Sequence, residues 1–153
     1  IAAVTFLPDG TRFAYAKRRL HGSENQFFQP GHGGPLFGTS TRNVAIAVCA
    51  DIVMEQFARE AAESGADLYA ASVLLSDQGY DKDCQYLARW AGDYRMAVLM
   101  ANHAEPTGGY LSSGGSALWD DKGNNVIRSG SGELLMVARR TDQGWQGEIH
   151  PLG

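Results

Sequence analysis

The order of apolar and polar positions predicts how the first third of the chain folds. Residues 1–7 are apolar and β-branched, residues 8–10 are Pro-Asp-Gly, and residues 12–16 return to a strand pattern. A turn of this composition between two such runs predicts a β-hairpin. Residues 21–40 are rich in glycine and contain two prolines, so we expect them to be mostly loop.

The middle of the chain alternates between strand and helix patterns. Residues 43–49 form a nearly continuous apolar run, which is typical of a strand covered on both faces. A helix is predicted over residues 53–64 with Gly65 as its stop, followed by a strand at 67–73. A second helix is predicted over 80–94 from its apolar stripe, and a buried strand over 96–101.

The remaining pattern predicts strands alone. Short runs at 116–119, 125–127, 133–138 and 145–150 are separated by polar turns, and we expect them to add antiparallel strands to the same sheet. Strand–helix alternation followed by strands predicts an α/β fold. No repeat or linker divides the chain, so residues 1–153 are interpreted as part of a single domain.

Composition narrows the classes of function. The 153 residues carry a formal net charge of −4, with no segment rich in Lys and Arg, so we expect no nucleic-acid or membrane partner. The chain has no signal-peptide pattern and opens on an Ile inside a predicted strand, which suggests a processed or truncated polypeptide. Two cysteines make no disulfide framework, although one bridge remains open, and a cytoplasmic location fits best.

Cys49 is the first candidate for chemistry. It ends a buried strand and precedes a predicted helix, and ligands of α/β sheets bind outside the carboxyl ends of the strands. The positive end of a helix also favours a thiolate. The alternative is that Cys49 is only a core residue, because free cysteine is commonly buried. Cys84 lies on the apolar stripe of a helix and is expected to serve packing alone.

The other polar candidates are weak when taken one at a time. Lys17 and Glu24 have the default interpretation of solvated surface groups. The four histidines show no metal-ligand spacing, and a Cys49–His103 dyad is a minor alternative. The glycine-rich stretches match neither a P-loop nor a dinucleotide fingerprint, so no metal or cofactor is expected.

Three segments taken together resemble the nitrilase superfamily of carbon–nitrogen hydrolases. The first is IAAVTFLPDGTRFAYAKRRLHGSENQFFQPG at residues 1–31, and the second is the nucleophile strand VAIAVCAD at 44–51. The third comprises VLMANHAEPTGG at 98–109 and GGSALWDDKGN at 114–124. The resemblance covers nearly the whole chain, and it implies the C-terminal part of a four-layer α-β-β-α sandwich.

The resemblance also implies roles for individual residues. Cys49 would attack a carbonyl or nitrile carbon, and Lys17 with the backbone N–H of Ala50 would stabilise the oxyanion. Glu24 would orient the lysine. The residues after the next strand, Ser72, Val73 and Leu74, would line the substrate pocket. Ala50 stands where the family often has an aromatic residue, so the subfamily stays open.

The family's general-base glutamate precedes the lysine segment, and no residue of this chain takes its place. The resemblance therefore implies a hydrolase of small amides, or else of nitriles, whose own N-terminal half supplies the base. A homo-oligomer is also expected. Two alternatives remain open: an inactive fragment that binds a ligand or partner, and an isochorismatase-like cysteine hydrolase. The all-β tail argues against the latter.

Overall fold

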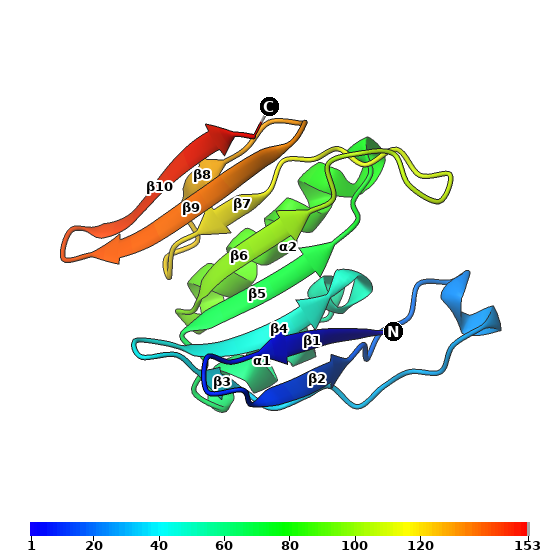
Figure 1. The fold of residues 1–153 in the computed structure, drawn as a ribbon, viewed down its shortest axis with the longest axis horizontal. Coiled ribbons are helices and arrows are strands. Elements are labelled where there is room, and N and C mark those ends of the chain that lie inside the picture. Colours follow the sequence, from blue (N-terminus) through cyan, green and yellow to red (C-terminus); the bar gives the residue numbers. More distant parts are fainter. Residues whose placement is uncertain (153) are drawn as a thin grey trace.

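The computed structural model describes residues 1–152 and contains a sheet flanked by helices and hairpins (Figure 1). Its strands are β1 (Ala2–Phe6), β2 (Arg12–Ala16), β3 (Phe37–Gly38), β4 (Asn43–Val48), β5 (Leu68–Val73), β6 (Ala97–Asn102), β7 (Ala117–Trp119), β8 (Asn125–Arg128), β9 (Leu134–Thr141) and β10 (Gly144–Pro151). Its helices are the α-helices α1 (Glu55–Glu63) and α2 (Asp77–Tyr94) and the 3₁₀ helices η1 (Glu24–Gln26) and η2 (Cys49–Val53). The predicted α/β class is confirmed.

The central sheet has the strand order β3-β4-β5-β6-β7-β8. Strands β4, β5 and β6 are parallel, because α1 and α2 carry the chain back between them, and β7 and β8 extend the sheet antiparallel. Both α-helices lie behind the same face of the sheet (Figure 1). The carboxyl ends of the three parallel strands therefore meet at one edge.

The core lies between the sheet and these two helices. Alternate residues of β4, β5 and β6 point toward the helices, among them Ala47, Tyr69 and Met100, and each is almost fully buried. Most of the residues between them face the other way and remain half-buried or exposed, as Ala70 and Leu99 do, although Val44 and Ala97 are buried. The sheet thus has one covered face and one face that is only partly covered.

Two hairpins flank that second face. In Figure 1, β1 lies in front of β4, and β9–β10 lie in front of β7 and β8, while the middle strands remain open. The prediction that the whole tail joins the same sheet is wrong for β9 and β10, which pair only with each other. Gly147 explains how this hairpin lies so close to the sheet, since a Cβ there would stand 2.5 Å from the side chain of Ile127.

The helix boundaries also differ from prediction. The helix expected over 53–64 is η2 followed by α1, because Met54 has an extended backbone that interrupts the helical run. Helix α2 begins at Asp77 rather than at residue 80, since its first turn is polar and adds nothing to the apolar stripe. Among the described residues, no helix combines the length and apolar character needed to cross a bilayer.

Candidate active site

The thiol of Cys49 lies at the carboxyl end of β4, on the first residue of η2. Its φ of 48° is in the left-handed region that non-glycine residues rarely adopt, and such strain is concentrated at functional sites. The side chain is half-buried, and its Sγ lies 4.0 Å from the carbonyl oxygen of Leu74. The sharp turn holds the thiol between the ends of β4 and β5.

Lys17 follows β2, and only 1% of its side-chain surface is exposed. Its ammonium donates to both oxygens of Glu24, at 2.7 and 2.6 Å. The backbone N–H of His21 donates to the same carboxylate at 2.7 Å. Burial opposes ionisation, but these hydrogen bonds and the charge of Lys17 lower the pKa of Glu24 below its usual value. The pair is a fixed, charged unit rather than a solvated surface pair.

One cavity of about 810 Å³ brings all of the predicted site residues together. The predicted residues that line it are Lys17, Glu24, Cys49, Ala50, Ser72, Val73 and Leu74. They come from three separate parts of the chain: the segment after β2, the turn after β4 and the carboxyl end of β5. Ser72 and Val73 were expected after that strand but are its last two residues, and only Leu74 follows it. The cavity therefore contains a thiol, an ammonium and a carboxylate within one set of walls.

His103, the minor candidate for a dyad with Cys49, also lines this cavity. Two further titratable side chains in its walls were not assigned to the site from the sequence: His21, and Asp83 from α2. Burial raises the pKa of Asp83, and the charge of Lys82 only partly offsets this effect. Asp83 was not a sequence candidate because it lies on a helix whose apolar stripe dominated the pattern. No group of three or more His, Cys, Asp or Glu in residues 1–152 is placed to hold a metal ion.

Asn102, at the end of β6, orders the cavity wall. Its Oδ1 accepts from the Leu75 N–H at 2.8 Å, and its Nδ2 donates to the Ser113 hydroxyl at 3.0 Å and to the carbonyl of Gly114. These bonds tie the turn after β5 to the segment before β7. The turn after β5, which carries Leu74, is thereby held from behind.

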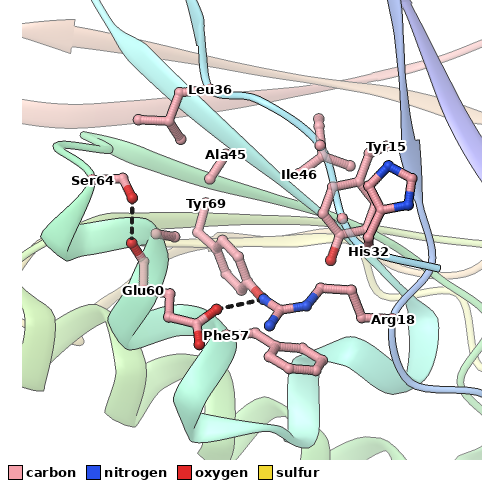
Figure 2. Close-up of a pocket in the computed structure, with 13 residues that line it drawn as sticks. Tyr15, Arg18, His32, Leu36, Ala45, Ile46, Phe57, Glu60, Ser64 and Tyr69 are labelled. Carbon is pink, nitrogen blue, oxygen red and sulfur yellow. Dashed lines mark hydrogen bonds and ion pairs between the residues drawn. The ribbon is translucent and has the colours of Figure 1, made fainter. Parts of the chain in front are cut away.

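A second cleft of about 500 Å³ is lined by residues of β2, β4 and α1 and by Arg18 (Figure 2). Arg18 crosses it, with its guanidinium 3.7 Å from the ring centre of Phe57 and 2.6 Å from the Glu60 carboxylate. The hydroxyl of Tyr69 is buried beside it and has no hydrogen-bond partner among the described residues. This cleft and the Cys49 cavity have no lining residue in common.

Comparison with known families decides the assignment. The model of the carbon-nitrogen hydrolase family matches residues 2–146. The chain belongs to the carbon–nitrogen hydrolase family. The predicted resemblance is therefore confirmed, and the isochorismatase-like alternative is not supported.

Solved structures of this hydrolase family match the chain closely. An amidase from Nesterenkonia sp. AN1, carrying acrylamide added at its active-site cysteine, matches with a TM-score of 0.75 and 25% identity over 84% of this chain and 52% of its own. The same amidase in complex with butyramide matches with a TM-score of 0.74 and 25% identity, over 84% and 51% of the two chains. Saccharomyces cerevisiae Nit3, of branch 10 of the nitrilase superfamily, shares the fold at TM-score 0.76 and 21% identity, over 86% and 49%.

The coverage of these matches shows how much of each solved structure corresponds to this chain. The chain spans about half the length of the solved structures that it matches. The predicted fold, a portion of the nitrilase-type sandwich, agrees with the shared architecture. The six-stranded sheet has α1 and α2 on one side, which corresponds to one half of a layered α-β-β-α arrangement.

Proposed function

We propose that this chain carries the nucleophile half of the active site of a hydrolase that cleaves small amides through a thioester on Cys49. The observation that supports this most is the shared cavity. A half-buried thiol on a left-handed turn opens into the same space as the buried Lys17–Glu24 pair. A nitrile is the second candidate substrate class.

The proposed reaction begins with attack by Sγ of Cys49 on the amide carbonyl carbon. A C–S bond forms, and the carbonyl electrons move to oxygen, where the ammonium of Lys17 and the N–H of Ala50 stabilise the negative charge. The C–N bond then breaks, and the amine leaves with a proton. Water attacks the thioester, the C–S bond breaks, and the carboxylic acid and the free thiol are released.

Glu24 has a positioning role in this proposal. Its carboxylate receives two hydrogen bonds from Lys17, so it fixes the direction of the ammonium. The walls formed by Ser72, Val73 and Leu74 would contact the acyl part of the substrate. Because a related amidase binds butyramide, a short aliphatic amide is the proposed substrate class.

The proton transfers require a general base. We propose that a glutamate in a separate N-terminal half of the protein supplies it, as the family resemblance implies. That half would lie against the open sheet face, and the assembled protein would form a homo-oligomer. Both cysteines are free, which fits the expected cytoplasmic location, since such compartments keep thiols reduced.

The proposal is tested in the complete protein, with any residues encoded before Ile1 included. Ammonia release from butyramide is measured for the wild type, Cys49→Ala and Cys84→Ala. Cys84 is buried in the core and does not line the cavity, so it is the matched control. Loss of activity in C49A alone supports the proposal, and comparable loss in both variants contradicts it.

A second measurement does not depend on turnover. Acrylamide is added to the folded protein, and the modified peptides are identified by mass spectrometry. Selective modification of Cys49 over Cys84 is expected, because only Cys49 opens into the cavity. Equal and slow modification of both thiols would favour a domain that binds ligands without catalysis.

A further inference from the structure

Asp51 is a fully buried carboxylate two residues after the nucleophile, and none of its surface is exposed. Four hydrogen-bond donors surround it. Its Oδ1 accepts from the backbone N–H groups of Arg18 at 3.1 Å and Arg19 at 2.6 Å. Its Oδ2 accepts from the Tyr15 hydroxyl at 3.1 Å and from the Val48 N–H at 3.1 Å. A carboxylate in this position can remain buried because every donor points at it.

The donors to Asp51 lie in the two chain segments that contain Lys17 and Cys49. Two of the amides belong to the residues that directly follow Lys17, and a third belongs to the residue that directly precedes Cys49. The fourth donor, Tyr15, lies on β2 two residues before Lys17. One side chain therefore joins the two segments that carry the nucleophile and the oxyanion partner. No ion pair of Asp51 is present in residues 1–152, since the nearby Arg18 guanidinium pairs with Glu60.

We propose that Asp51 is the positioning residue that fixes the Cys49 thiol relative to the Lys17 ammonium. This inference rests on the proposed function. Asp51 lies outside the cavity wall and does not contact a substrate there, so its effect acts through the backbone on both sides. A displacement of about 1 Å between reacting groups can lower a rate by about 10².

Tyr15 makes the same network open to a graded test. Burial, together with the neighbouring charge of Asp51, raises the pKa of Tyr15, so its hydroxyl stays protonated and donates. Its ring and Arg18 line the second cleft (Figure 2), whereas Arg19 and Val48 line the Cys49 cavity. Removing the Tyr15 hydroxyl takes away one donor and leaves the three backbone donors in place.

The experiment compares Asp51→Asn and Tyr15→Phe in the complete protein, with butyramide as substrate. In D51N, an NH2 group replaces one carboxylate oxygen. This group donates hydrogen bonds, so it cannot accept those that the replaced oxygen accepted. We expect kcat to fall about 10²-fold with KM nearly unchanged, because positioning rather than binding is lost. In Y15F, a several-fold fall in kcat is expected. Met96→Ala is the control: Met96 is fully buried directly before β6, and it does not line the Cys49 cavity.

The outcomes separate the two proposals. Wild-type kcat in D51N, or a loss no larger than in an M96A variant of equal Tm, overturns the role of Asp51 and leaves the proposed function standing. If the wild type shows no Cys49-dependent hydrolysis, the proposed function fails. The rate of acrylamide addition to Cys49 then decides: a slower rate in D51N supports the inference, and an unchanged rate overturns it. If D51N does not fold, Y15F decides: a several-fold fall in kcat, or a slower acrylamide addition to Cys49, supports the inference, and wild-type values overturn it.

Discussion

The burial of the Lys17 ammonium is the feature that most separates this site from an ordinary surface pair. A solvated Lys–Glu pair contributes about 0–1 kcal/mol, because water competes for both groups. Here the lysine side chain is 1% exposed and the glutamate side chain 25% exposed, so water competes little for the ammonium, and losing its partner would leave it unpaired in the interior. The pair places an ammonium, matched by a carboxylate, in the wall of the thiol's cavity, so replacing either residue should affect rate or stability.

Substitution of each member of the pair should have a different effect. Lys17→Met removes the proposed oxyanion donor and should lower kcat by about 10²–10³. Glu24→Gln leaves a buried ammonium without its counter-charge and should destabilise the fold by about 3–5 kcal/mol. The measurements are amide hydrolysis and urea unfolding at pH 7. Arg89→Met, which breaks an exposed i,i+4 pair with Asp93, is the control and should change neither quantity appreciably.

The pH dependence of this pair follows from the direction of the shift. The pKa of Glu24 is lowered in the folded state, so its contribution to stability is present above the unfolded value of about 4.3 and is lost as the pH falls through the lower folded value. The stability difference between wild type and E24Q should therefore be constant from pH 5 to pH 7 and shrink below pH 4. A difference that does not change with pH would contradict the ion pair.

At the scale of elements, the sequence predicts the strands and helices whose own apolar periodicity shows which side is buried. The apolar run of β4 and the stripe of α2 lie in the core, so their periodicity was sufficient. Helix η2 was not predictable, because its shape depends on hydrogen bonds between Asp51 and residues more than thirty positions away. The separate β9–β10 hairpin also escaped prediction, since alternation does not state which sheet a strand joins.

The residues of the candidate site also divide into those with a local sequence signal and those without one. Cys49 has a local signal, the end of a buried strand, and Lys17 and Glu24 were recognised only through the resemblance. Asp51 stood in the quoted nucleophile strand, but no pattern could show that its carboxylate reaches the amides after Lys17. The sequence does contain one signal for Asp51: it is an acidic residue close after a buried strand, where a buried carboxylate needs hydrogen-bond partners. That signal marks the residue but not its partners.

Tyr80 links helix α2 to the segment before β7, and its hydroxyl donates to the carbonyl of Gly115. Burial, reinforced by Cys84, raises the pKa of Tyr80 to about 12. Because the folded pKa lies above the unfolded value of about 10, this contribution is complete below pH 10 and is lost as the pH rises toward 12. Unfolding free energy of the wild type should fall more steeply over that interval than that of Tyr80→Phe.

The control for this prediction lies in the other buried tyrosines. Tyr15 and Tyr69 also have raised pKa values from burial, and they remain in both proteins, so only the difference between the two curves reports Tyr80. At pH 7, Y80F should lose about 1 kcal/mol through the missing hydrogen bond. Parallel curves between pH 10 and pH 12 would show that the hydroxyl is not buried in solution.

At the scale of the whole molecule, the sheet face opposite the two helices is only partly covered. The helices cover one face, the hairpins cover the flanks of the other, and the middle strands β5 and β6 remain open between them (Figure 1). The residues that point outward there include Ala70 and Leu99, both half-buried, and the exposed Ser72 and Ala101. Small and apolar side chains on both strands are typical of a face that packs against another layer.

We expect that face to be buried in the complete protein, where the proposed N-terminal half would supply the missing layer. Ala70→Asp should then place an unpaired charge in an interior and lower the unfolding free energy by several kcal/mol. Leu135→Asp on β9 is the matched control, because Leu135 is 51% exposed and a surface change there should stay within about 0.5 kcal/mol. Both variants are compared by urea unfolding of the complete protein. Equal, small effects would mean that solvent covers this face, and the active site would then have to find its general base among groups already lining the cavity, such as His103 and Asp83.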